Sequence, residues 1–252
     1  MKARRVFVFS PAHNEEKIIP EFVERFARMQ RTAPPDVRFT LLIINDGSTD
    51  GSKLLLSRLS KKYSFLRVKN TAWNGPMKTV FEGFEEGLRS SADVILRLDS
   101  DLEHEPERIP DLMRLHDSGA GMAVGLMHYS LRVGVMDYLF NRISGYSSGK
   151  KVAGRSFPQF CPGFMSFTKP ALKRVLPRLR VLAEKFERSK GEPMTSVDLV
   201  AIAAARASGV RVDFLDLDGS TLGSSRGFKK ILRYIKLYAK TMRFLEEERL
   251  VH

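Results

Sequence analysis

The sequence is poor in cysteine and in long apolar runs. Its single cysteine, Cys161, excludes an internal disulfide framework and favours a reducing compartment, so we expect a cytoplasmic protein. No segment approaches the roughly 18 apolar residues that a membrane-spanning helix needs. The first apolar segment, residues 6–9, is too short for a signal peptide and predicts a strand. We therefore expect a soluble chain, or one held peripherally on the cytoplasmic face of a membrane.

Acidic residues are also in the minority. Lys and Arg number 42 against 29 Asp and Glu, which gives a net charge of +13 and a pI of about 10.0. This balance favours anionic partners such as phosphorylated ligands, an anionic membrane surface or nucleic acid. The motifs described below favour phosphorylated ligands, and we expect no nucleic-acid partner. With 43% hydrophobic residues, the 252-residue chain is long enough to bury a large core.

Apolar runs and helical periods alternate along the first half of the chain. Strands are expected at residues 6–9, 39–44, 65–68, 94–98 and 121–127, separated by helices at 15–30, 52–62, 77–89 and 109–115. This alternation predicts an α/β fold with a mainly parallel sheet and helices on both faces.

The second half is less regular. Residues 129–160 are rich in Ser, Gly and basic residues and predict a long loop with one helix near 136–143. Further strands are expected at 163–167 and 210–217, and further helices at 170–182, 195–207 and 228–247. We expect one domain over residues 1–225, with a nucleotide-binding half (1–130) and an acceptor half (131–225), followed by a basic C-terminal helix (226–252).

Two carboxylates follow the fourth expected strand. Asp99 and Asp101 come directly after the apolar segment 94–98. Carboxylates this close repel each other, which raises a pKa, and a divalent cation removes that conflict. Oxygen ligands suit Mg²⁺ or Mn²⁺, either of which would hold a diphosphate. The alternative interpretation is a solvated acidic turn.

Polar segments follow two other strands as well. Residues 10–16 and 45–51 occupy the same position after their strands as residues 99–105 do after theirs. Ligands of parallel α/β sheets bind at the carboxyl ends of the strands. The convergence of three polar segments at one end of the sheet predicts a nucleotide-type site.

The three segments carry motifs of a known family. Their sequences are FSPAHNEE over residues 9–16, INDGSTD over 44–50 and LDSDLEHEP over 98–106. In order and placement they resemble the family 2 glycosyltransferases, which have a GT-A fold. The extension of the third motif is similar to that of polyprenyl-phosphate glycosyltransferases, the subgroup that includes dolichol-phosphate mannose synthase. The resemblance covers about residues 5–130.

The resemblance implies roles for residues of the first half. It assigns the binding of the nucleotide sugar to Pro11, His13, Glu15, Ile44, Asp46, Asp99, Ser100 and Asp101. Asp99, Asp101 and Glu103 would ligate Mg²⁺ or Mn²⁺, which neutralises the leaving nucleoside diphosphate. Structural alternatives remain open, because Asn14 with its acidic neighbours is also typical of a helix cap and Asp46 of a plain turn.

Basic residues of the second half match the family less closely. Arg226 lies in a segment similar to a phosphate-binding motif, with Lys229 and Arg155 as further candidates; the alternative is a solvated basic face. His104 is either a partner of the metal ligands or a structural histidine. The chain departs from the usual family residues at Asn45, Glu103, Gln159, Ser220 and at Met127 or His128. Two expected phosphate-binding arginines are thereby missing, which leaves donor and acceptor open.

The implied reaction is a single displacement with inversion at the anomeric carbon of a hexose, mannose or glucose, carried by GDP or UDP. A hydroxyl acceptor needs a general base, for which Asp198 is the candidate; an Asp near a helix start is also common for structural reasons. A phosphate acceptor is already ionised. The absence of a clear Glu-Asp base motif favours a polyprenyl (dolichyl) phosphate over a glycan or another hydroxyl acceptor.

The last expected helix has two interpretations. Its apolar residues form one stripe with basic residues largely off it, a pattern typical of a helix on anionic lipid and also of a helix packed on its own domain. Two rival functions belong to other classes. A non-catalytic basic binding protein on a degenerate transferase fold stays open, whereas an Asp-x-Asp phosphohydrolase would carry its nucleophile after the first strand.

Overall fold

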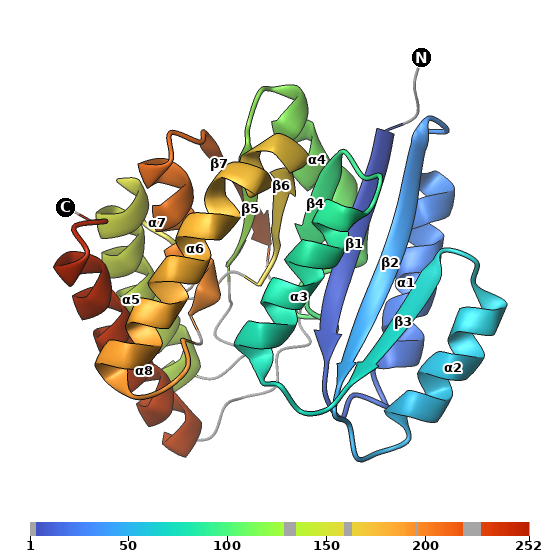
Figure 1. The fold of residues 1–252 in the computed structure, drawn as a ribbon, viewed down its shortest axis with the longest axis horizontal. Helices are drawn as coiled ribbons and strands as arrows, with labels where there is room; N and C mark the ends of the chain where they lie inside the picture. The colour runs from blue at the N-terminus through green and yellow to red at the C-terminus, as the bar shows by residue number, and fades with distance from the viewer. Residues whose placement is uncertain (1–3, 129–134, 159–162, 195, 219–227, 252) are drawn as a thin grey trace.

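The computed structural model describes residues 4–128, 135–158, 163–194, 196–218 and 228–251 (Figure 1). Within these residues the centre of the molecule is a seven-stranded sheet in the order β3-β2-β1-β4-β6-β5-β7. The strands are β1 (Arg4–Ala12), β2 (Val37–Asp46), β3 (Leu66–Thr71), β4 (Val94–Arg97), β5 (Met122–His128), β6 (Met165–Thr168) and β7 (Val212–Asp218).

The helices cover both faces of this sheet. They are α1 (Ile19–Thr32), α2 (Ser52–Lys62), α3 (Pro76–Arg89), the 3₁₀ turn η1 (Pro106–Arg108), α4 (Ile109–Asp117), α5 (Val135–Ala153), α6 (Lys169–Lys190), α7 (Val197–Ala207) and α8 (Phe228–Glu247). One core cluster contains α3, α5, α6, α7 and α8, and the other contains α1, α2 and α4. In Figure 1, α3 and α6 lie in front of the sheet and α1 lies behind it. The predicted fold class is confirmed.

The sheet is parallel except for β6. This strand lies antiparallel between β4 and β5, whereas β1 pairs in parallel with both β2 and β4. In that register Pro11 lies beside Ile44, and Phe9 lies beside Arg97. The carboxyl ends of β1, β2 and β4 therefore meet, as the sequence predicted. We call the segments that follow them, residues 13–18, 47–51 and 98–105, the strand-end loops.

The helix expected near residues 136–143 is present, but α5 is longer than predicted, since its 19 residues extend into the segment that was expected as a loop. The helix packs against α7 and α8, and its small residues allow close contact. A Cβ added to Gly149 would lie 2.6 Å from the backbone nitrogen of Phe157. Gly and Ser lower local helix propensity, and here the tertiary packing outweighs that preference.

The apolar stripe of α8 packs on the domain over the part whose side chains are described. Met242, Phe244 and Leu245 are buried, and the ring of Phe244 meets that of Phe186 edge to face at 5.2 Å. Ile235, about two turns before Met242, is 43% exposed. Among the helices described, none combines the length and apolar character needed to cross a bilayer.

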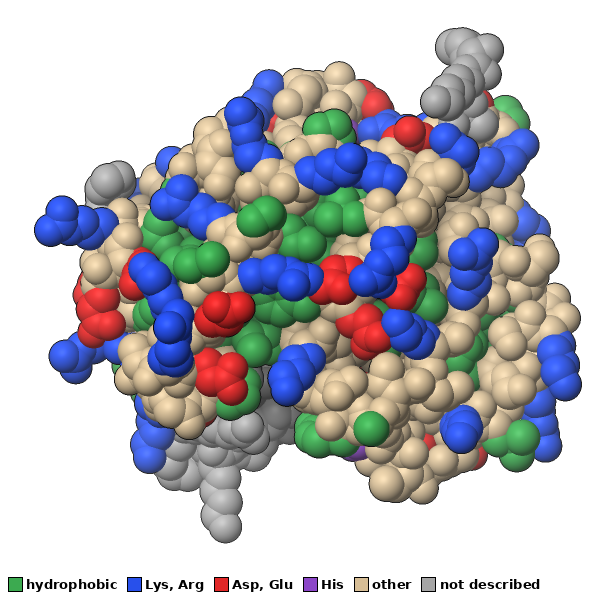
Figure 2. All heavy atoms as spheres, viewed as in Figure 1, with side chains coloured by type: hydrophobic (Ala, Val, Ile, Leu, Met, Phe, Trp, Pro, Cys, Tyr) green, Lys and Arg blue, Asp and Glu red, His purple; other side chains and the backbone are tan. Residues whose placement is uncertain are grey.

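Charged side chains of both signs are interspersed on the face formed by α3 and α6. Figure 2 shows Lys and Arg spread over this face around an apolar strip, with Asp and Glu between them. The net positive charge is therefore distributed on this face and does not form a stripe of one sign.

Candidate active site

Hydrogen bonds join the first two strand-end loops. Asn14 adopts a left-handed conformation (φ 57°), and its Oδ1 accepts hydrogen bonds from the amides of Thr49 at 2.8 Å and Asp50 at 3.4 Å. The amide of Gly51 donates to Glu16 Oε2 at 3.0 Å. Because α1 begins only at Ile19, Asn14 fixes the turn after β2 instead of capping its own helix.

His13 lies at the surface beside an exposed tryptophan. Its Nδ1 donates to the carbonyl oxygen of Asp46 at 2.7 Å, which fixes the imidazole plane. The ring of Trp73 meets it edge to face with centroids 4.3 Å apart, and Trp73 is 59% exposed. Sequence reasoning missed Trp73, although a lone tryptophan in the polar loop before α3 is a signal that could have identified it.

The two predicted nucleotide contacts of β2 have their side chains directed into the protein. Ile44 is fully buried in the core. Asp46 is buried too, and its oxygens accept hydrogen bonds from the amides of Asn74 at 2.8 Å and Gly75 at 3.0 Å and from the Thr71 hydroxyl at 3.1 Å. Asp46 thereby holds the loop between β3 and α3, the loop that carries Trp73.

Glu15 and Ser100 connect the first strand-end loop to the third. The hydroxyl of Ser100, which is buried, contacts the Glu15 carboxylate and donates to the carbonyl oxygen of Pro11 at 3.0 Å. Burial raises the pKa of Glu15 to about 7; the hydrogen bond from Ser100 opposes this shift, and the charge of Asp99 adds to it. A protonated Glu15 is thus accessible near neutral pH.

Asp99 is held by the preceding arginine. Arg97 Nε lies 3.0 Å from Asp99 Oδ1 and Nη2 lies 3.1 Å from Oδ2, while Nη1 contacts Asp198 of α7. The Asp198 side chain is 4% exposed. Burial raises the pKa of Asp198, and the Arg97 guanidinium opposes that rise. The structure thus brings the candidate metal ligand and the candidate base together through a residue that sequence reasoning did not select.

The backbone just before β6 also approaches Asp99. A Cβ added to Gly163 would lie 2.3 Å from Asp99 Oδ2, so a larger residue at this position would have to displace the carboxylate from its place beside Arg97. Gly163 belongs to the segment that resembles the S-G-F motif of the polyprenyl-phosphate subgroup. The close approach gives a physical reason for glycine at this position.

Asp101 and Glu103 flank a strained turn. Leu102 between them has φ 60° and is buried, an unfavourable conformation for a bulky residue. The Glu103 amide donates to Asp101 Oδ1 at 3.0 Å. The surrounding protein atoms, together with the charges of Glu103 and Asp99, raise the pKa of Asp101 to about 8.

Glu15, Asp99, Asp101 and Glu103, the acidic cluster, suit a divalent cation only in part. The mutual repulsion that raises the pKa of Asp101 would be relieved by Mg²⁺ or Mn²⁺, so Asp101 fits a cation. Asp99 does not fit in this arrangement, because Arg97 already engages both of its oxygens. No group of three or more metal-binding side chains is preformed among the described residues.

His104 is a buried structural histidine in the described part of the chain. Burial lowers its pKa and favours the neutral ring, which packs near Phe164 with centroids 5.8 Å apart. Neither ring nitrogen has a hydrogen-bond partner among the described residues. The geometry therefore does not show His104 supporting a neighbouring carboxylate.

The predicted basic residues are only partly visible. Arg226, Gln159 and Ser220 lie outside the described residues, as does the side chain of Lys229. Met127 is buried, so His128 is the residue exposed at the end of β5. Its Nε2 lies 3.1 Å from Asp216 Oδ1, and Arg155 Nη2 lies 2.7 Å from Asp216 Oδ2.

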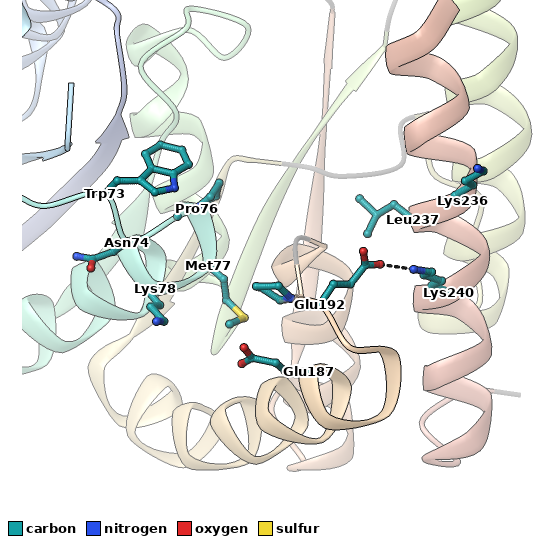
Figure 3. Close-up of a pocket in the computed structure, with 12 residues that line it drawn as sticks. Trp73, Asn74, Pro76, Met77, Lys78, Glu187, Glu192, Lys236, Leu237 and Lys240 are labelled. Carbon is teal, nitrogen blue, oxygen red and sulfur yellow. Dashed lines mark hydrogen bonds and ion pairs between the residues drawn. The ribbon is translucent and has the colours of Figure 1, made fainter. Parts of the chain in front are cut away.

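A cavity of about 410 Å³ opens beside the loop that Asp46 holds (Figure 3). Its lining combines apolar and basic side chains from α3 and α8 with carboxylates from the end of α6 and beyond, namely Trp73, Pro76, Met77, Lys78, Glu187, Glu192, Lys236, Leu237 and Lys240. Lys240 Nζ lies 2.5 Å from Glu192 Oε1. Since α3 follows the carboxyl end of β3, the cavity lies at the same end of the sheet as the strand-end loops.

Known proteins share parts of this arrangement. The chain is 31% identical to the dolichol-phosphate mannosyltransferase of Pyrococcus furiosus over 121 residues. These residues are 48% of this chain and 32% of that protein. It is also 31% identical to the polyprenol monophosphomannose synthase of Mycolicibacterium smegmatis over 124 residues, 48% of this chain and 44% of that one. The chain thus matches less than half the length of these curated relatives.

A solved structure matches nearly the whole fold. Glucosyl-3-phosphoglycerate synthase from Mycobacterium tuberculosis, in complex with Mn²⁺, uridine diphosphate and phosphoglyceric acid, superimposes with a TM-score of 0.58 at 14% identity, covering 96% of this chain and 78% of that one. At this identity the likeness shows the fold alone. The family model described as glycosyl transferase family 2 matches residues 7–176, about two thirds of the chain. Together with the three motifs at the strand ends, that match confirms the predicted family: the chain belongs to glycosyl transferase family 2.

Proposed function

We propose that this protein transfers a hexose, mannose or glucose, from GDP or UDP to a polyprenyl phosphate with inversion at the anomeric carbon, and that the transfer depends on Mg²⁺ or Mn²⁺. The two curated relatives named above are, by their names, polyprenyl-phosphate sugar transferases. The family match and the strand-end loops support a nucleotide-sugar donor.

On the donor side, Trp73 and His13 offer an aromatic surface on which the nucleobase would stack. Asp101 and Glu103 would hold the cation, which when bound neutralises charge on the departing diphosphate. Glu15 and Ser100 connect the loops that carry these groups and keep them in register. Ile44 and Asp46 would contribute mainly by supporting the loop walls, since their side chains face the interior.

The observation that carries the choice of acceptor is the state of Asp198. A general base must reach the acceptor hydroxyl, yet Asp198 is 4% exposed and engaged by Arg97. A phosphate acceptor is already ionised and attacks without such a base. The cavity beside α3 suits an amphipathic phosphate, because Lys78 and Lys236 can meet the anion while Met77 and Leu237 contact an isoprenoid.

Peripheral attachment to an anionic membrane would bring the enzyme to such an acceptor. On α5 the side chains of Leu139, Ile143 and Tyr146, spaced as successive turns of one face, are 45%, 69% and 58% exposed. Arg142 and Lys150 on the same helix are exposed as well. Exposed apolar side chains flanked by basic ones are typical of helices that bind at a lipid surface.

A product-trapping assay tests this function. Purified protein with Mn²⁺ and radiolabelled GDP-mannose or UDP-glucose is given dolichyl or undecaprenyl phosphate in detergent, and label in the organic phase is counted. The matched control acceptor is the corresponding polyprenol, which lacks the phosphate. We expect label only with the phosphate. Equal transfer to the polyprenol, or transfer only to an oligosaccharide, would replace the lipid-phosphate acceptor with a hydroxyl acceptor.

A further inference from the structure

Arg97 is an unusual residue for its position. It ends β4 after three buried apolar residues and is followed by the buried Leu98, and its own side chain is 12% exposed. A charge in such a place is costly unless it is paired. Here the guanidinium is paired on both sides, with Asp99 through two hydrogen bonds and with Asp198 through a third.

The pairing with Asp99 is bidentate, the geometry that gives arginine–carboxylate pairs their strength. It occupies both oxygens of a carboxylate that the family resemblance assigns to the metal. Asp101, two residues on, is not held in this way; in the described structure its hydrogen bond comes from the Glu103 amide. The two carboxylates of the Asp-x-Asp motif therefore differ in what a cation must displace to reach them.

We propose that Arg97 is an internal cation that competes with the divalent metal ion for Asp99. The inference rests on the proposed function only in that it places Mg²⁺ or Mn²⁺ at the acidic cluster. A metal ion entering at Asp101 must share the Asp99 carboxylate with the Arg97 guanidinium or displace it, and the positive charge of the guanidinium opposes the ion in both cases. Arg97 thereby lowers the affinity of the metal-free protein for the ion and acts as a positioning residue for Asp99 and Asp198.

Electrostatics sets the size of the effect. The guanidinium attracts the carboxylate that the ion needs, and it repels the ion itself. Part of this cost is recovered when Arg97 keeps its bond to Asp198, so the net penalty on metal binding is smaller. We expect the Arg97→Met variant to bind Mn²⁺ at least about tenfold more tightly than the wild type.

The test measures Mn²⁺ binding to the metal-free protein by calorimetry and by electron paramagnetic resonance, with no nucleotide and no acceptor. Arg211 provides a matched control. Its Nε donates to Asp213 Oδ1 at 3.1 Å and its Nη2 donates to Oδ2 at 2.7 Å, the same bidentate pairing with a carboxylate two residues later. That pair lies at the start of β7, at the opposite end of the sheet. Arg211→Met should leave Mn²⁺ affinity at the wild-type value.

Removing Arg97 leaves Asp198 buried without its partner, which would destabilise the fold. A second variant, Arg97→Met with Asp198→Asn, removes the orphaned charge, and thermal unfolding followed by circular dichroism shows which variants are folded. Tighter Mn²⁺ binding in the folded variant, lost again on adding Asp101→Asn, supports the proposal. Unchanged, weaker or undetectable Mn²⁺ binding without Arg97 overturns it, as does tightening that survives Asp101→Asn. An incorrect acceptor assignment would show only in the product-trapping assay.

Discussion

Carboxylates near the carboxyl end of β4 and carboxylates near the carboxyl ends of β5 and β7 differ in how far basic side chains neutralise them. After β4, the acidic cluster contains more carboxylates than the single guanidinium of Arg97 can neutralise, and the pKa of Asp101 is raised to about 8. After β5, the arrangement is balanced: partial burial of Asp216 is outweighed by hydrogen bonds from Arg155 and His128, which lower its pKa. At the same end of the sheet, the carboxylates after β4 therefore favour an external cation, whereas Asp216 is neutralised by side chains of the protein.

The largest expected effect comes from removing Asp101, the carboxylate of the pair that no guanidinium holds within the described residues. Asp101→Asn should lower the transfer rate by about a thousandfold, or about 4 kcal/mol, because the cation loses its main ligand. Release of nucleoside diphosphate from the donor in the presence of Mn²⁺ measures this. Asp213→Asn, at the opposite end of the sheet, should keep the wild-type rate. A similar loss in both variants would contradict a special role for Asp101.

Asp46 tests how strongly the donor side is fixed by internal hydrogen bonds. Asp46→Ala leaves the amides of Asn74 and Gly75 without their acceptor in a buried position, so the free energy of unfolding should fall by about 2–3 kcal/mol. Urea denaturation measures the loss. Asp117→Ala, which removes a 63% exposed partner of Arg4, should cost less than about 0.5 kcal/mol. Equal costs would show that the Asp46 hydrogen bonds contribute nothing particular.

The pH dependence of stability probes Glu15. Its folded-state pKa of about 7 lies above the ordinary value of 4.5, so the folded protein keeps a proton that the unfolded chain releases. The contribution of Glu15 to the free energy of unfolding should therefore be fully present below pH 4.5, and about 2–3 kcal/mol of it should be lost as the pH rises to about 7. In Glu15→Gln this component disappears, as measured by denaturation of metal-free protein at each pH. Parallel profiles for the two proteins would contradict the raised pKa.

Trp73 tests whether the aromatic surface beside His13 binds the nucleobase. Trp73→Ala should weaken the binding of the nucleoside diphosphate about tenfold, since stacking on a base contributes about 1–2 kcal/mol. Calorimetric titration with GDP and UDP measures the affinity. Trp73→Phe, which keeps an aromatic face, should retain most of it. Identical affinities for the Ala and Phe variants would remove Trp73 from the base site.

The smallest expected effect is on vesicle binding through the exposed side chains of α5. Ile143→Ser should reduce binding to vesicles containing anionic phospholipid about fivefold, because one partly inserted side chain contributes about 1 kcal/mol. Sedimentation with vesicles measures the bound fraction. Val181→Ser, on α6, is the matched control, since Val181 is 50% exposed and should not touch the lipid. Equal loss in both variants would make the effect unspecific.

Much of the donor side could be predicted because its determinants are local. Apolar runs of four or more residues specified β1, β2 and β4, and the motifs after them placed Glu15, Ser100 and Asp101 at one end of the sheet. Helices α2 and α8 lie where their periods predicted, at residues 52–62 and 228–247. The family resemblance supplied the roles, which neither composition nor periodicity would have distinguished from an acidic turn.

The remainder depends on contacts between distant residues. Arg97 and Asp198 are 101 positions apart, and no local pattern marks their pairing. The burial of the Asp46 carboxylate against Asn74 arises from the pairing of β2 with β3. Helix α5 was predicted only near residues 136–143, because Gly and Ser weaken the local pattern of its remainder, while its stability comes from α7 and α8.

The fit of Gly163 against Asp99 couples two segments that are far apart in the sequence. Strand β6 lies antiparallel beside β4. The backbone at Gly163, just before β6, therefore packs against the Asp99 carboxylate that follows β4. A displacement of about the width of one methyl group on either side would be transmitted directly to the other, since packed interiors leave little free space. On the proposed function, an acceptor that shifts the segment around Gly163 would therefore change the position of Asp99, a candidate ligand of the metal ion.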